Sequence, residues 1–120
     1  TACNSLTVCM FAVVPPSELA ELLSAALGEA WTPQDLMAAG ERAWNLKRAI
    51  NCRLGLTPAS EVLPRLLLQP LPEGGQEGHV PDVALLLDEY YEASGWERES
   101  GRPRAETLRR LGLEFAEQEP

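Results

Sequence analysis

Side chains capable of metal-binding or nucleophilic chemistry are few in this 120-residue sequence. It contains three cysteines, Cys3, Cys9 and Cys52, and a single histidine, His79. An odd number of cysteines with no CxxC pair indicates neither a disulfide framework nor a closed zinc site. One histidine provides no His-based catalytic pair, and free thiols are typical of reducing, cytoplasmic proteins. The residues themselves therefore predict no complete metal or catalytic site within this sequence.

Cys9 has the most informative surroundings of the three thiols. It lies in an apolar run, residues 6–14, that ends at Pro15 and Pro16. The residues leave two interpretations open, an inert buried thiol, because free cysteine is among the most buried residue types, or a ligand whose partners are missing. The sequence begins at Thr1 without a methionine, so we expect it to be a piece of a longer protein.

Apolar residues recur at helical spacing along almost the whole chain, so the elements that position these cysteines are predicted to be helices. After the two prolines, Ser17 is predicted to cap a first helix that ends at Gly28. A second, longer helix is predicted to start with Thr32 as its cap and with Asp35 in a capping box. It ends before the glycine at position 55, and its predicted apolar stripe consists of Leu36, Ala39, Ala43, Leu46, Ile50 and Leu54.

The rest of the chain divides at a segment rich in proline and glycine. Residues 56–81 predict no sustained helix or strand apart from a turn or two near 60–67. Residues 82–113 predict two further helices, in which Tyr90, Tyr91 and Trp96 pack the first of them onto the long second helix. An acidic tail, 114–120, is expected to fray. The expected organisation is an opening segment (1–14), two helices (15–55), the irregular segment (56–81), two helices (82–113) and the tail.

Charge excludes several classes of partner. Ten Lys and Arg against eighteen Asp and Glu give a net charge of −8, which would repel nucleic acids and anionic membranes. No apolar stretch reaches the roughly 18 residues of a membrane helix, so we expect a soluble, cytoplasmic protein. The basic residues of the long helix fan around its axis, which predicts local ion pairs with Glu41 and neighbouring acids. Trp44 lies off the main stripe and either packs on the first helix or awaits an absent partner.

Five blocks follow one another along the chain: GERAWNLKRAINCRLG, LPRLLLQPLPEG, GHVP, LLDEYYEASGW and TLRRLGL. In order and spacing they resemble the C-terminal domain of the aldehyde ferredoxin oxidoreductase family, and the resemblance covers essentially all 120 residues. The helical spacing predicts an all-α, irregular domain of about four to five helices. The resemblance implies that this domain is a fragment of a three-domain enzyme.

Members of that family carry an Asp-x-x-Gly-Leu-Cys motif, whose cysteine completes a [4Fe–4S] cluster begun by a CxxCxxxC in the preceding domain. The matching stretch here is NSLTVC, at positions 4–9. The resemblance therefore implies that Cys9 is the cluster ligand, since such clusters are held by thiolates. Asn4 stands where the family has a pterin-contacting Asp, and its amide can hydrogen-bond a pterin but cannot accept as a carboxylate does. Thr7 replaces the Gly and would crowd a close backbone approach.

The resemblance also implies a function for the whole enzyme. It oxidises aldehydes to carboxylates at a tungsten or molybdenum bis-pterin centre and passes electrons through the cluster to ferredoxin. We expect the isolated domain to be inactive, with the missing N-terminal and middle domains, ferredoxin and an aldehyde as partners, and a homodimer is left open. Two alternatives remain: a reductive family member resembling the active-site subunit of benzoyl-CoA reductase, and a non-catalytic helical interaction module. Because its partners are missing, the opening segment is expected to expose Leu6, Val8 and Phe11 or to have them buried by a neighbouring copy.

Overall fold

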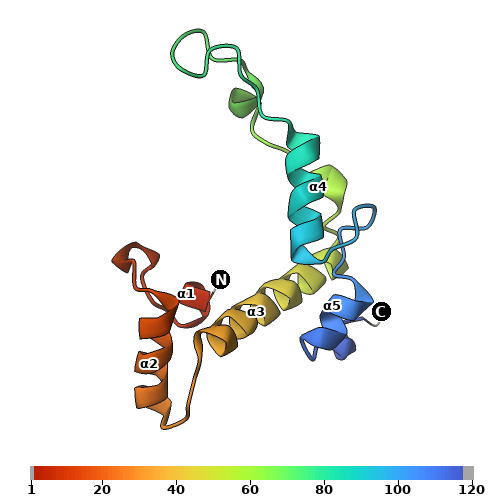
Figure 1. The fold of residues 1–120 in the computed structure, drawn as a ribbon. Coiled ribbons are helices and arrows are strands. Elements are labelled where there is room, and N and C mark those ends of the chain that lie inside the picture. Colours follow the sequence, from red (N-terminus) through yellow and green to blue (C-terminus); the bar gives the residue numbers. More distant parts are fainter. Residues whose placement is uncertain (1, 118–120) are drawn as a thin grey trace.

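The protein consists of helices joined by irregular segments (Figure 1). The computed structural model describes residues 2–117, except for the side chain of Met10. Within that range there is no β-strand, only two isolated bridges, so the all-α prediction is confirmed. The elements are α1 (Ala2–Ser5), η1 (Met10–Ala12), α2 (Pro16–Leu27), α3 (Pro33–Arg53), η2 (Pro58–Ser60), η3 (Arg65–Leu68), α4 (Val83–Ser94), α5 (Ala105–Arg110) and η4 (Glu114–Ala116), where η marks a 3₁₀ turn.

Helix α3 is the central element, about 31 Å long at 1.5 Å per residue. Its start is fixed by the predicted capping box. The Asp35 amide donates to Thr32 Oγ1 at 3.2 Å, and the Thr32 amide donates to Asp35 Oδ2 at 2.9 Å. The side-chain and backbone hydrogen bonds from Thr32 hold the pKa of the Asp35 carboxyl below its ordinary value. After α3 the chain turns at Gly55, whose φ is +95°.

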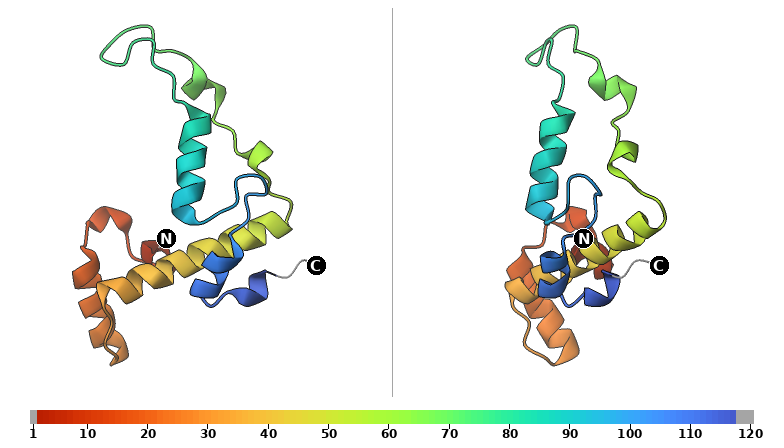
Figure 2. Two further views of the ribbon diagram at one scale, coloured as in Figure 1. Left: turned by 45° about the vertical axis from the view of Figure 1, so that its right-hand side comes forward. Right: turned by 90° about the vertical axis from the view of Figure 1, so that its right-hand side faces the viewer.

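Helices α1 and α2 pack against the N-terminal half of α3 (Figures 1 and 2). Gly40 permits the approach of α1, because a Cβ at this position would lie 3.1 Å from Ala2 Cβ and from its backbone nitrogen. The prediction that Ser17 caps α2 is wrong. The cap is Pro15 and the first helical residue is Pro16, two residues earlier than a Ser17 cap would give, because the fixed φ of proline suits the first helical position.

The C-terminal elements form the main buried apolar cluster of the described residues. Leu108, Leu111 and Leu113 are buried together, and Leu46 of α3 and Ala116 of η4 pack against them. The predicted fraying of the tail is therefore wrong for its first residues, which form η4 against this cluster. The rest of the tail, 118–120, lies outside the described residues.

The buried face of α3 differs from the predicted apolar stripe. Leu36 is buried as expected, whereas Leu54 at the other end of the stripe is 81% exposed. Two polar residues, Asn45 and Arg48, are buried instead, beside Ala49. A pattern of apolar spacing does not mark such positions, because their burial depends on hydrogen-bond partners from distant parts of the chain.

Residues 56–94 form an arm that leaves the end of α3 and returns along α4 (Figures 1 and 2). Its outgoing part holds only the short turns η2 and η3, so the prediction of no sustained structure in 56–81 is confirmed. Helix α4 is capped at its start by Asp82, whose Oδ1 accepts from the Leu85 amide at 3.1 Å, and at its end by Gly95, which has φ +69°. The arm stands away from the other helices.

The described part of the chain is extended. Its radius of gyration is 18.0 Å, against about 14 Å for a compact domain of this length. Many large apolar side chains remain exposed on the opening segment, on α3 and on the arm. The described residues contain no helix long and apolar enough to cross a membrane.

Candidate functional site

The segment around Cys9 is the first candidate site. Helix α1 is closed by hydrogen bonds from the Leu6 amide to the Ala2 carbonyl (3.0 Å) and from the Val8 amide to the Cys3 carbonyl (2.9 Å). Cys9 follows in extended conformation, with φ −64° and ψ 119°, and its carbonyl accepts from an amide of η1. Its side chain is exposed.

Two β-branched residues with left-handed backbone flank Cys9. Thr7 has φ +56° and Val13 has φ +50°, and no other non-glycine residue among those described has a positive φ. This conformation costs about 1–2 kcal/mol per residue with a β-carbon. Thr7 occupies the position at which the motif quoted above has Gly, which adopts this conformation freely. The segment therefore keeps a backbone suited to glycine while carrying a threonine.

The apolar side chains of this segment are only partly covered. Phe11 is 86% exposed, as expected for a surface that lacks its partner, whereas Leu6 and Val8 are half-buried. None of the three enters the buried cluster of α5 and η4. Asn4, the candidate pterin contact, is exposed on α1, and its carbonyl accepts from the Thr7 amide at 3.3 Å. Asn4 and Cys9 thus belong to one short, folded unit.

This unit can supply one metal ligand and no complete site. Within residues 2–117, no group of three or more His, Cys, Asp or Glu side chains is placed to hold a metal ion. All three cysteines are free, and Cys3 and Cys52 are half-buried. An exposed thiol on a defined backbone fits the role of a single ligand to a group held mainly by other parts of a protein. His79 lies in the arm loop and is exposed.

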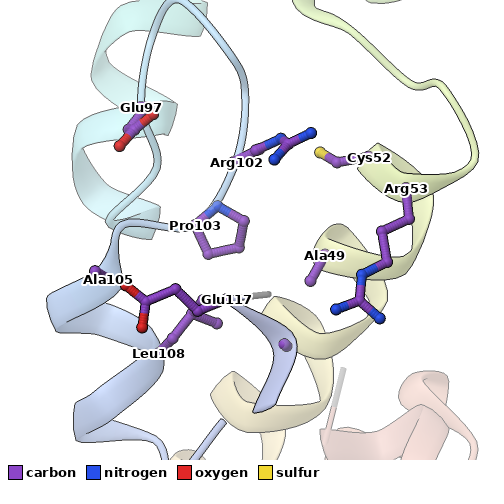
Figure 3. A pocket seen from close by; sticks show the side chains of 10 residues that line it. Ala49, Cys52, Arg53, Glu97, Arg102, Pro103, Ala105, Leu108 and Glu117 are labelled. Carbon is purple, nitrogen blue, oxygen red and sulfur yellow. The ribbon is translucent and has the colours of Figure 1, made fainter. Parts of the chain in front are cut away.

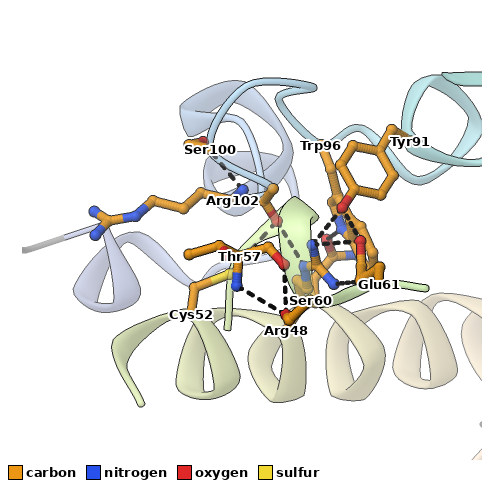
Figure 4. Close-up of polar contacts among 11 residues, drawn as sticks. Arg48, Cys52, Thr57, Ser60, Glu61, Tyr91, Trp96, Ser100 and Arg102 are labelled. Carbon is orange, nitrogen blue, oxygen red and sulfur yellow. Dashed lines mark hydrogen bonds and ion pairs between the residues drawn. The ribbon is translucent and has the colours of Figure 1, made fainter. Parts of the chain in front are cut away.

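A second cluster of polar side chains lies where α3 meets the arm and the 95–104 loop (Figure 4). Its centre is Arg48, which is buried. The Arg48 guanidinium donates to the Gly101 carbonyl at 2.6 Å and to the Tyr91 hydroxyl at 2.8 Å, and it forms an ion pair with Glu61. Its Cζ lies 4.2 Å from the centre of the Trp96 ring. Arg48 thereby ties the start of the arm, the end of α4 and the following loop to α3.

The pKa shifts of Glu61 and Tyr91 fit a structural role for this cluster. Burial alone would raise the pKa of the Glu61 carboxyl, but the hydrogen bonds from Arg48 and Tyr91 outweigh it and hold that pKa below its ordinary value. Burial raises the pKa of the Tyr91 hydroxyl, and its hydrogen bond to Glu61 raises it further. No buried side-chain polar atom among the described residues lacks a hydrogen-bond partner. The cluster is satisfied internally and offers no free acid or base.

The sequence predicted that Tyr90, Tyr91 and Trp96 pack α4 onto α3, and the Tyr91 and Trp96 rings contact Arg48 of that helix. Trp96 Nε1 donates to the buried Asn45 Oδ1 at 2.9 Å. Trp44 stacks on Trp96, with ring centres 6.1 Å apart, so the interpretation that it packs on the first helix is wrong. A cavity of about 400 Å³ opens beside these rings.

The basic residues of α3 also find partners other than those predicted. Glu41 pairs with Arg110 of α5, 69 positions away, rather than with its neighbours on α3. Arg42 donates to the Leu111 carbonyl at 2.7 Å. The prediction of a local ion pair is therefore wrong for Glu41. These side chains hold the C-terminal elements on α3.

Cys52 lines another cavity, of about 240 Å³, between α3 and the C-terminal segments (Figure 3). Arg53, Arg102 and Pro103 lie around the same space. The Cys52 Sγ is 3.5 Å from the Gly101 carbonyl oxygen. The Cys52 thiol donates a weak hydrogen bond to this carbonyl oxygen.

A family model described as aldehyde ferredoxin oxidoreductase, domains 2 and 3, matches residues 1–113. The tungsten-containing aldehyde ferredoxin oxidoreductase of Pyrococcus abyssi is 45% identical over 96 residues, which are 78% of this chain and 16% of the relative. The protein of the same name from Pyrococcus furiosus is 38% identical over 114 residues, 92% of this chain and 19% of the relative. The protein of that name from Thermococcus kodakarensis is 42% identical over 95 residues.

This chain spans less than a fifth of the length of the curated relatives that it matches. It is helical, has no strand in its described residues and offers one exposed thiol on a defined segment. These features agree with a part of a larger enzyme rather than a whole one. The chain belongs to the aldehyde ferredoxin oxidoreductase family.

Proposed function

We propose that this chain is the C-terminal domain of a tungsten- or molybdenum-pterin oxidoreductase that oxidises aldehydes to carboxylates. The observation that carries the proposal is the exposed Cys9 thiol, which follows a left-handed residue at the motif position of the family's glycine. Relatives named as tungsten-containing aldehyde ferredoxin oxidoreductases support the class of enzyme.

In this proposal Cys9 supplies one thiolate to a [4Fe–4S] cluster whose other ligands come from the preceding part of the protein. When bound, such a cluster supplies one-electron transfer between the metal centre and ferredoxin. Cys9 carries its ligand on a backbone closed by α1 and η1, so the thiol is positioned before the cluster is present. A ligand from this domain would also join it to the domain that holds the other three.

Asn4 is proposed to contact the pterin through its side-chain amide. The amide is exposed, and it offers one acceptor oxygen and two donor hydrogens, which suit the alternating donors and acceptors of a pterin edge. It brings no negative charge, in contrast to the family's aspartate. The isolated domain is expected to be inactive, because in this proposal the main pterin-binding region and the other three cluster ligands belong to other domains.

The test is made on the full-length polypeptide that contains this chain, expressed with tungstate or molybdate and purified without oxygen. We expect iron and either tungsten or molybdenum in the protein, and aldehyde-dependent reduction of ferredoxin. The 120-residue chain alone serves as the inactive control. Purification of a folded full-length protein without iron and without either metal would overturn the proposal.

A further inference from the structure

The arm exposes large apolar side chains on both of its limbs. On the outgoing limb, residues 62–71, Leu66 is 76% exposed, and on the returning limb, α4, Leu86 is 53% exposed. Other exposed apolar side chains on the two limbs are Val62, Leu67, Leu71 and Leu85. Single exposed apolar residues are ordinary, but a set gathered on one projecting element marks an interaction surface.

The base of the arm is held in a defined direction. Glu61, directly before the outgoing limb, forms its ion pair with Arg48 of α3. Tyr91, at the end of the returning limb, is hydrogen-bonded to the same guanidinium. Both limbs therefore leave α3 from one buried cluster (Figure 4). A surface held in this way loses less conformational freedom on binding than a flexible loop would.

The length of the relatives and the net charge of this chain indicate what covers the apolar surface of the arm. The relatives are more than five times as long as the region matched here, so most of a protein of this family lies outside the chain. A covalently joined partner is present at a high effective concentration. A second copy of this chain would instead bring a further net charge of −8 toward the first.

We propose that the apolar surface of the arm docks against the preceding part of the same polypeptide. The inference rests on the proposed function, which places the cluster-binding and pterin-binding domains in that part. The arm and the Cys9 segment would then be two separate contacts of this domain with the rest of the enzyme. The apolar side chains of residues 62–71 and of α4 would be covered in the full-length protein.

The experiment measures thiol labelling in the full-length protein, resolved by peptide mass spectrometry. Leu66→Cys and Leu86→Cys are compared with Gln76→Cys, a control in the exposed loop between the two limbs. If the arm is docked, the first two thiols should react at least about tenfold more slowly than the control, because labelling requires local opening. Equal rates at the three positions would overturn the inference. Slow labelling found only in a dimer and lost in the monomer, as sized by light scattering, would also overturn it and assign the surface to a second copy.

Charged variants provide an independent readout. Leu66→Lys combined with Leu86→Lys should make the arm accessible to protease in the full-length protein, whereas Gln76→Lys should leave the digestion pattern unchanged. Iron content is measured on the same preparations. A covered arm in an iron-free protein would support the docking of the arm and overturn the proposed cluster. An exposed arm in a protein that holds its cluster would overturn the docking of the arm and leave the proposed cluster standing.

Discussion

Replacing Arg48 by methionine tests the account of what holds the arm on α3. The change keeps most of the aliphatic chain but leaves the Glu61 carboxylate, the Tyr91 hydroxyl and the Gly101 carbonyl without their shared donor. Removing one partner of a buried ion pair costs about 3–5 kcal/mol. Because the Glu61 side chain is 23% exposed, we expect the lower end, about 3 kcal/mol, which is roughly a hundredfold change in the unfolding equilibrium.

The measurement is urea unfolding of the chain followed by tryptophan fluorescence, since the Arg48 guanidinium lies over the Trp96 ring. Arg110→Met is the matched control. It removes an exposed ion pair with Glu41 and should cost at most about 1 kcal/mol. A second variant, Arg48→Met with Glu61→Leu, should recover part of the loss because no unpaired carboxylate remains. If Arg48→Met costs no more than Arg110→Met, the buried cluster does not hold the arm and the reasoning fails.

Three further predictions concern the backbone and the pH dependence. The pKa of the Glu61 carboxyl in the folded protein lies below its ordinary value of 4.5. The ionised carboxylate therefore stabilises the folded protein above pH 4.5, and this stabilisation is lost as the pH falls through the folded pKa. Urea midpoints should therefore fall less in acid for Glu61→Gln than for the wild type. Thr7→Gly should be about 1 kcal/mol more stable than Thr7→Ala in thermal unfolding, because position 7 has φ +56°. Gly95→Ala should destabilise the protein more than Gly28→Ala does, since both positions have positive φ but only a Cβ at position 95 would clash with Thr107 Oγ1. Equal losses of stability in the two variants would contradict the clash.

Much of the fold could be predicted because its signals are local. Each of these signals lies within a few neighbouring residues. They are the capping box of Thr32 and Asp35, the glycines that end α2 and α4 (Gly28 and Gly95), and the proline-rich break. The start of α2 was misplaced by two residues, with Ser17 predicted as the cap where the structure has Pro15. Serine is a favourable cap, but Pro16 already fits the first turn.

The burial of polar residues on α3 could not be predicted in the same way. Arg48 finds Glu61 and Tyr91, 13 and 43 positions away, and Glu41 finds Arg110, 69 positions away. Helical periodicity identifies a face but not the partner that will satisfy a buried guanidinium. The only sequence signals of this cluster were the aromatic residues near position 91 and an isolated acid in the irregular segment.

The candidate site could be predicted only in part from the residue types and their spacing. Nothing in the spacing of the cysteines distinguishes Cys9 from Cys52, and its proposed role rests on the resemblance of positions 4–9 to the family motif. The expectation at position 7 was only that Thr7 would crowd a close backbone approach, and its positive φ was not predicted. The resemblance could not indicate how Thr7 accommodates the strain, or that Val13 shares it.

The most direct measurement of the central claim is the iron content of the full-length enzyme carrying Cys9→Ser, with EPR of the reduced protein. A serine hydroxyl is a poor, high-pKa substitute for a thiolate. The account predicts that the variant loses the cluster or holds a three-iron form, whereas Cys52→Ser, at a half-buried packing position, keeps the wild-type cluster. A fully occupied four-iron cluster in the Cys9→Ser enzyme would contradict the account.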